Sequence, residues 1–125
     1  MNFIRFWFPV ILYSGIIFYV SSLHHVPAPQ KIPHFDKFCH LVEYGLFGLL
    51  LARAIKGSRP GIDRPTIIML ATIGSLLYGL SDEYHQSFVA GRESGLLDVL
   101  ADTAGGFLGG LTYTWIDNFK KKRTY

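Results

Sequence analysis

Four long apolar segments constrain this chain more than any other feature of its sequence. Each is close to the ~20 residues that a helix needs to cross ~30 Å of hydrocarbon. They comprise residues 3–23, 38–55, 65–84 and 96–116. Half of the 125 residues are hydrophobic and only 17% are charged, which is fewer charges than an ordinary soluble domain carries. We therefore predict an all-α bundle of four transmembrane helices, with residues 1–125 forming a single domain.

The first apolar segment differs from a cleavable signal peptide. It contains Pro9 and several aromatic residues, it approaches full spanning length, and no A-x-A type cleavage site precedes His24. We expect it to be retained as the first membrane helix.

Composition also bears on the partners of the chain. A single cysteine, Cys39, excludes an internal disulfide and a paired-cysteine zinc motif. The net charge of +3 does not indicate nucleic acid as a partner, because the basic residues flank apolar runs instead of forming a patch on a soluble domain. Membrane lipids are the partners that this composition implies.

The distribution of lysine and arginine predicts the orientation in the membrane. Nine of the 12 lie on the side that also holds both ends of the chain: Arg5, Arg53, Lys56, Arg59, Arg64, Lys120, Lys121, Lys122 and Arg123. The other three are Lys31, Lys37 and Arg92. Because cytoplasmic loops retain Lys and Arg in excess, we predict a multi-pass protein of the cell membrane with both termini in the cytoplasm.

Polar residues gather at the outer ends of the second, third and fourth predicted helices. The second carries Asp36, His40, Glu43 and Tyr44; the third Tyr78, Ser81, Asp82, Glu83, His85 and Gln86; the fourth Asp98 and Asp102. Many follow i, i+4, i+7 spacing, which places them on one helix face. An ionisable residue in a spanning helix costs ~2.5–3.5 kcal/mol and normally has a partner or a function. We therefore predict an outer-facing polar cleft. His24, His25 and His34 are expected to be solvated loop residues.

Small residues offer a way for these stripes to meet. Gly105 and Gly109 are four residues apart, which is typical of surfaces where transmembrane backbones approach closely. Gly45, Gly48 and Gly79 could serve similarly on the other helices. The packing order of the helices does not follow from the sequence.

The residue types in the predicted cleft suggest roles. Imidazoles and carboxylates act as general acids and bases, which makes these the candidate catalytic residues: His40, Asp82, Glu83, His85 and Asp98. The same groups can ligate a divalent metal, so a metal cofactor is left open.

Other polar residues complete the cleft. Cations and hydrogen-bond donors hold phosphates or carboxylates, which gives four candidate substrate-binding residues: Lys37, Tyr44, Gln86 and Arg92. Additional polar positions are Asp36, Glu43, Ser81 and Asp102. A lipid-linked phosphate or an anionic envelope component would suit this chemistry.

Three motifs in this order and spacing resemble the VanZ-like family of small integral membrane proteins. They are Asp36-Lys37-x-x-His40-x-x-x-Tyr44, then Ser81-Asp82-Glu83-x-His85-Gln86-x-Phe88-Val89-x-Gly91-Arg92, then Asp98-x-x-Ala101-x-x-x-Gly105. Two positions depart from the family pattern: Ala90 stands where proline is usual, and Asp102 stands where asparagine is frequent. The resemblance implies a four-helix membrane protein and, through the family's namesake, resistance to the lipoglycopeptide teicoplanin. It implies no particular reaction.

Three classes of function remain open from the sequence. An enzyme would use a histidine and a carboxylate as acid and base, with Arg92 holding an anion. A non-catalytic binding or shielding module would use its polar residues only to fix helix packing. An ion or proton pathway would need ionisable groups that continue inward, and the inner halves of the four predicted helices carry few.

Overall fold

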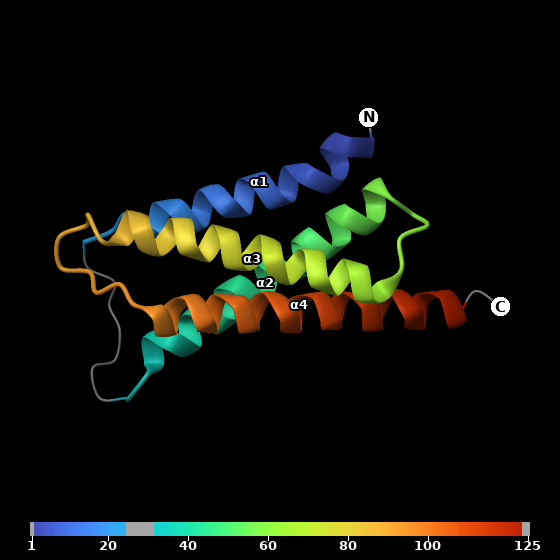
Figure 1. Ribbon diagram of the computed structural model, residues 1–125. Helices are drawn as coiled ribbons and strands as arrows, with labels where there is room; N and C mark the ends of the chain where they lie inside the picture. The colour runs from blue at the N-terminus through green and yellow to red at the C-terminus, as the bar shows by residue number, and fades with distance from the viewer. Residues whose placement is uncertain (1, 25–31, 124–125) are drawn as a thin grey trace.

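The computed structural model describes residues 2–24 and 32–123, and this part of the chain forms four α-helices and no β-strand (Figure 1). The helices are α1 (Asn2–Ser21), α2 (Phe35–Ser58), α3 (Arg64–Gln86) and α4 (Leu96–Lys122). The predicted all-α four-helix fold is confirmed. Because α2 begins earlier than the apolar run indicates, the polar pair Asp36 and Lys37 lies in its first turn.

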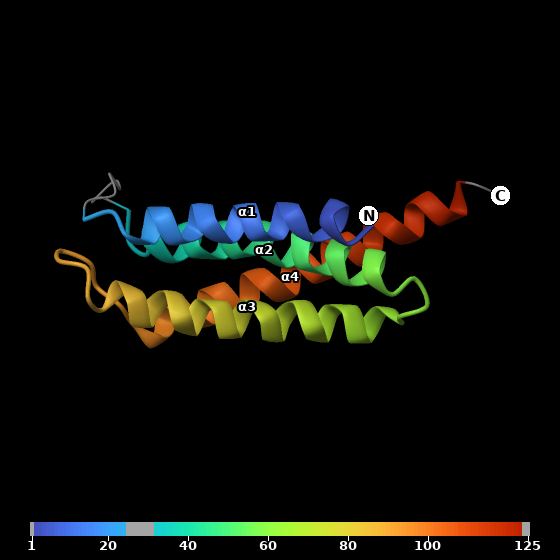
Figure 2. The same cartoon turned by 90° about the horizontal axis from the view of Figure 1, so that it is seen from above.

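All four helices extend from one end of the molecule to the other, with α2 crossing α4 obliquely, so the molecule has two distinct ends (Figures 1 and 2). We call one the acidic end; it holds the end of α1, the start of α2, the end of α3 and the start of α4. The opposite, basic end holds the start of α1, the link between α2 and α3, and the end of α4. The two chain termini therefore lie at the same end.

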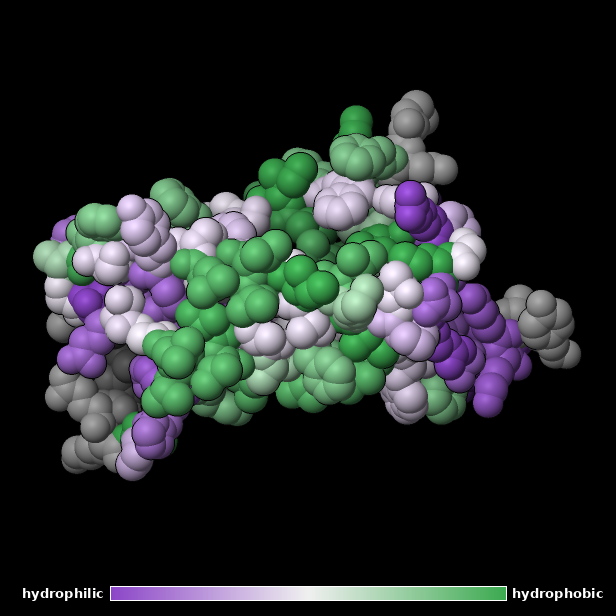
Figure 3. Space-filling view, viewed as in Figure 1, coloured by the Kyte–Doolittle hydropathy of each residue, from purple (hydrophilic) through white to green (hydrophobic). Residues whose placement is uncertain are grey.

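An apolar band crosses the middle of the bundle. On the face seen in Figure 3, hydrophobic side chains cover the central surface, and hydrophilic side chains gather towards both ends. Exposed large hydrophobic residues are especially frequent on α1, where they include Phe3, Ile4, Phe8, Ile11, Leu12, Ile16, Phe18 and Tyr19. In water such a surface would be unfavourable, whereas lipid tails solvate it.

Three helices are long and apolar enough to cross a membrane, namely α1 from Phe3, α2 and α3. Helix α4 is not among them because its apolar run is interrupted by buried polar and small residues, Asp98 and Asp102 among them. Its 27 residues nonetheless extend for about 40 Å, and it packs along both α2 and α3.

Glycines set the distance between α4 and α2. A Cβ atom placed on Gly105 would lie 2.5 Å from the carbonyl oxygen of Leu41, and one on Gly109 would lie 2.6 Å from the amide nitrogen of Leu49. Gly48 meets α4 in the same way, with Gly106 Cα 2.6 Å from its hypothetical Cβ. The backbones of the two helices are therefore in direct contact, and we call this contact the glycine seam.

A polar cap fixes the start of α3 at the basic end. Asp63 accepts hydrogen bonds from the Thr66 hydroxyl at 2.7 Å and from the Thr66 backbone N–H at 3.1 Å. The hydroxyl bond, followed by the backbone bond, holds the pKa of the Asp63 carboxyl below its usual range. Pro65 follows in the first turn, where a missing N–H leaves no hydrogen bond unmade. The basic link thus ends in a defined turn.

The glycine seam predicts that Gly109→Ala destabilises the bundle. The added methyl group meets backbone atoms of α2 that cannot rotate away, so we expect a loss of about 1–3 kcal/mol in the free energy of unfolding. The matched control is Gly15→Ala in α1, where the new Cβ has no atom within 4 Å and helix propensity improves. Unfolding of both variants in mixed micelles checks this; equal stability of the two variants would contradict the seam.

Candidate functional site

Four ionisable side chains from three helices meet at the acidic end of the bundle. They are His40 of α2, Asp82 and Glu83 of α3, and Asp102 of α4. One nitrogen or carboxylate oxygen from each residue lies within 4.8 Å of those of the others, and all four residues are buried. We call this set the His–carboxylate cluster. It lies just beyond the glycine seam, which brings α2 and α4 close enough for His40 and Asp102 to touch.

Each member of the cluster has a hydrogen bond to a neighbouring group. His40 Nδ1 lies 2.8 Å from Asp102 Oδ1, and because an ionised carboxylate only accepts, the ring Nδ1–H donates this bond. Tyr44 donates its hydroxyl to Asp82 Oδ2 at 3.2 Å, and the Gly95 backbone N–H donates to Glu83 Oε2 at 2.8 Å. These bonds fix the orientation of the imidazole and the three carboxylates.

Two carboxylate oxygens of the cluster are buried without a hydrogen-bond partner in the described part of the chain. They are Glu83 Oε1 and Asp102 Oδ2. The Asp102 oxygen points at bare backbone of α3, since a Cβ placed on Gly79 would lie 2.8 Å from it. Because Asp82 lies three residues after Gly79 on the same helix face, this oxygen is directed towards the carboxylates of α3.

The carboxylates of the cluster are close enough to repel one another strongly. At an effective dielectric constant of about 20, two unit negative charges within the 4.8 Å of this cluster repel by at least about 3 kcal/mol. One imidazole cannot balance three carboxylates. The cluster therefore attracts positive charge, whether as protons or as a bound cation.

Basic residues lie at the margin of the cluster. Lys37 Nζ forms ion pairs at 2.6 Å with both Asp36, which is largely exposed, and Asp98, which is buried. Arg92 lies in the turn between α3 and α4 and interacts electrostatically with Glu43 of α2. Lys37 thus neutralises carboxylates beside the cluster, and its side chain keeps 28% of its surface exposed.

Of the candidate catalytic residues, His85 and Asp98 are not members of the cluster, and His85 contacts α1 instead. Its Nε2 lies 2.9 Å from the Ser22 hydroxyl, and its ring stacks on Phe18 of α1 with centroids 4.5 Å apart. Tyr78, on the same face of α3, also turns to α1 and donates its hydroxyl to the Ser14 carbonyl oxygen. This face of α3 therefore binds α1, and Glu83 takes the place in the cluster that spacing suggested for His85.

The remaining predicted residues have varied positions. Ser81 is exposed and donates its hydroxyl only to the Tyr78 carbonyl of its own helix, whereas Gln86 is buried at the end of α3. His24 and His34 are exposed, as expected of solvated residues. His25 and Lys31, which we also assigned to this side, lie outside the described residues.

An aromatic layer closes the inner side of the cluster. The ring of Phe47 packs on Tyr78 at 5.0 Å and on Tyr44 at 5.8 Å between centroids. Tyr44 thus connects the aromatic layer with the His–carboxylate cluster, because its ring packs in the layer and its hydroxyl donates to Asp82. The layer separates the cluster from the apolar middle of the bundle.

Sequence reasoning missed the serines of α1. Ser21 is buried to 2% exposure, and its hydroxyl has no partner among the described residues; Ser22 holds His85. Two consecutive serines at the end of an apolar run, level with the polar stripes of the other helices, are the signal by which they could have been found.

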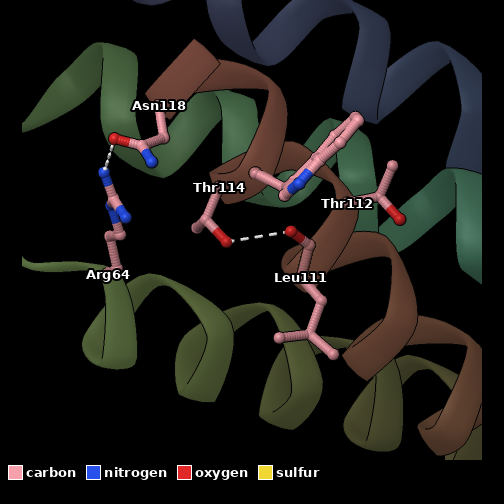
Figure 4. A pocket seen from close by; sticks show the side chains of 6 residues that line it. Arg64, Leu111, Thr112, Thr114 and Asn118 are labelled. Carbon is pink, nitrogen blue, oxygen red and sulfur yellow. Dashed lines mark hydrogen bonds between the residues drawn. The ribbon is translucent and has the colours of Figure 1, made fainter. Parts of the chain in front are cut away.

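A second surface feature lies at the basic end. A groove of about 580 Å³ is lined by Arg64, Leu111, Thr112, Thr114, Trp115 and Asn118 (Figure 4). Arg64 donates to the side-chain oxygen of Asn118, and the Thr114 hydroxyl donates to the Leu111 carbonyl at 2.9 Å. Since these polar groups have partners within the protein, the groove presents mainly apolar walls.

The buried pair of His40 and Asp102 predicts strong coupling between the two residues. His40→Leu leaves a fully buried carboxylate without its donor, which costs about 3 kcal/mol of unfolding free energy. The double variant with Asp102→Leu removes both polar groups and should be less destabilised than the sum of the single variants. Unfolding in mixed micelles measures this cycle, with His85→Leu as a control expected to lose under about 1.5 kcal/mol. Additive effects would show that the pair is not formed.

The sequence matches one protein family over nearly its whole length. The family model described as VanZ/LLP1 covers residues 2–117, which include α1, α2, α3 and most of α4. No match was found among curated proteins or among solved structures. Because the matched region is far more than half of the chain, the chain belongs to the VanZ/LLP1 family.

Proposed function

We propose that this protein binds or acts on an anionic, lipid-linked envelope molecule at the acidic end of the bundle. The observation that carries the proposal is the His–carboxylate cluster, in which reactive side chains of three helices converge inside an apolar bundle. Intramembrane ionisable groups are costly and are functional by default, and four of them at one point are difficult to explain by packing alone.

The surroundings of the cluster fit an amphipathic ligand. The sides of the bundle are apolar and suit a lipid tail, while Lys37 and Arg92 lie near the cluster and suit a phosphate or carboxylate head group. Exposed apolar residues of the turn after α3, such as Phe88, extend this surface at the same end. An opening of the cluster to the outer leaflet is part of the proposal.

The main alternative is a non-catalytic binding or shielding module. The observation that favours it is that much of the polar set is paired within the protein, as in the bonds of Asp102 to His40 and of Asp98 to Lys37. Such pairs fix helix packing without reacting. In this case apolar surface residues would matter for function and the carboxylates only for stability.

Substitution of Asp82 distinguishes a functional His–carboxylate cluster from a non-catalytic shielding module. Asp82→Asn keeps the shape and the contact with Tyr44 but removes part of the negative charge by which the cluster holds protons or a cation. Less positive charge is then available to a phosphate head group, so we expect binding of a polyprenyl phosphate to fall at least tenfold. The matched control is the neighbouring Ser81→Ala, which removes a hydroxyl that serves only its own helix. Native mass spectrometry of the purified full chain measures binding, with the uncharged polyprenol as the control ligand.

Cell experiments extend the same comparison to the phenotype of the family's namesake. Wild-type and variant proteins, expressed at equal levels in a susceptible host, are compared for teicoplanin susceptibility and for the amounts of lipid-linked envelope precursors. Loss of both effects in Asp82→Asn, with Ser81→Ala unchanged, supports a functional cluster. An Asp82→Asn variant that behaves as wild type in binding and in cells would leave the shielding module as the better account.

The proposal places the acidic end outside the cell, with α4 as the fourth membrane crossing. Introduced cysteines test this in a Cys39→Ser background, because Ser87 is exposed at the acidic end and Gly61 is exposed at the basic end. A membrane-impermeant maleimide added to intact cells should label Ser87→Cys, and should label Gly61→Cys only after permeabilisation. The reverse labelling pattern would show that the basic end faces the outside of the cell and would contradict the proposed topology.

A further inference from the structure

We propose that His40, Asp82, Glu83 and Asp102 form a binding site for one divalent cation of the manganese, iron or zinc type. The inference deepens the proposed function by naming the cofactor of the same site, and rests on that function only for what the ion does. The site itself rests on the positions and burial of the four side chains.

The spacing of the donor atoms suits a single ion. With bonds of about 2.1 Å, the ligand atoms of a tetrahedral site lie about 3.4 Å apart, and opposite ligands of an octahedral site lie about 4.2 Å apart. The four donor atoms of the cluster already lie within 4.8 Å of one another. Small side-chain rotations therefore suffice to close the set around an ion.

Two oxygens of the cluster lack the partner that a buried carboxylate requires. Asp102 is fully buried and its Oδ2 has no hydrogen-bond partner among the described residues; the same holds for Oε1 of Glu83, which is 7% exposed. The Asp102 oxygen is directed at α3 beside Gly79, where a side chain would displace it. A cation between α3 and α4 would satisfy both oxygens and remove the repulsion between the carboxylates.

The existing hydrogen bonds prepare the other donors. His40 Nδ1 and Asp102 Oδ1 lie 2.8 Å apart, which is close to the spacing of neighbouring ligands on one ion. An ion that displaces the proton between them would be bound by Nδ1 and by Asp102, with the ring proton on Nε2. The bonds of Asp82 to Tyr44 and of Glu83 to Gly95 hold the other two carboxylates in place.

The donor set also indicates the kind of ion. Carboxylate oxygens suit manganese and magnesium, whereas imidazole nitrogen suits zinc and iron, so one imidazole with three carboxylates favours an ion between these groups. Magnesium retains most of its water and is held less well by a buried set of protein ligands. An ion bound here would lie near Lys37, and it would supply positive charge to the head group of an anionic ligand.

The test is metal binding by the purified full chain in detergent, after removal of any affinity tag. Addition of ZnCl₂ or MnCl₂ alone should saturate at about one ion per chain, as measured by isothermal titration calorimetry and by elemental analysis. Asp102→Asn should weaken the affinity at least tenfold. The matched control is Asp117→Asn, on the same helix but at the basic end, where Asp117 pairs with Lys121; its affinity should equal that of the wild type.

X-ray absorption spectroscopy of the wild type decides the case if Asp102→Asn fails to fold. The zinc-loaded protein should show oxygen and nitrogen ligands at about 2.0–2.1 Å with the outer-shell scattering of one imidazole. Absence of saturable binding, equal binding by Asp102→Asn and wild type, or a spectrum without imidazole would each overturn the site.

The two proposals can fail separately. Saturable metal binding without binding of polyprenyl phosphate would refute the proposed function and keep the cation site. Full binding of the phosphate by chelator-treated protein that takes up no metal would refute the cation site and keep the proposed function.

Discussion

The contact between the backbones of α2 and α4 determines the rest of this structure. Gly105 and Gly109 place α4 against the carbonyl and amide groups of α2, with no side chain between the two helices. One turn beyond Gly105 on α4 lies Asp102, and this separation allows its carboxylate to reach His40 directly. Larger residues at the glycine seam would hold the two helices apart and leave His40 and Asp102 unpaired. The formation of this buried pair therefore depends on the absence of side chains at Gly105 and Gly109.

The number and approximate positions of the helices could be predicted because membrane thickness imposes a length on apolar runs. The end of α4 could not, since it continues beyond the apolar segment through the polar residues Asp117, Asn118 and Lys120 to Lys122. The composition of the cluster was harder to foresee. Neighbouring positions on a helix differ by about 100°, so the choice between Glu83 and His85 depends on which helices flank α3. The order in which the helices pack is a tertiary property. The spacing of residues along one sequence does not determine it.

The cluster and the aromatic layer divide the bundle into two chemical environments. On one side of Phe47 and Tyr78, buried carboxylates and an imidazole lie close to the end of the bundle. On the other side the interior is largely apolar and contains no buried charged residue among those described. Tyr44 bridges the two, since its ring packs with Phe47 and its hydroxyl binds Asp82. This arrangement agrees poorly with a continuous path for ions or protons through the bundle. It is more typical of a site that is reached from a single face.

The attachment of α1 has a consequence for how sequences of this family can diverge. Its polar contact with Tyr78 ends on the backbone carbonyl oxygen of Ser14, which every residue provides. Its outer face requires only apolar character, because lipid imposes no shape on it. Evolution can therefore replace most residues of α1 without loss of the fold, whereas α2, α3 and α4 must preserve particular side chains. Related sequences should therefore vary more along α1 than along the other three helices, while α1 keeps the apolar character that lets the family model match it.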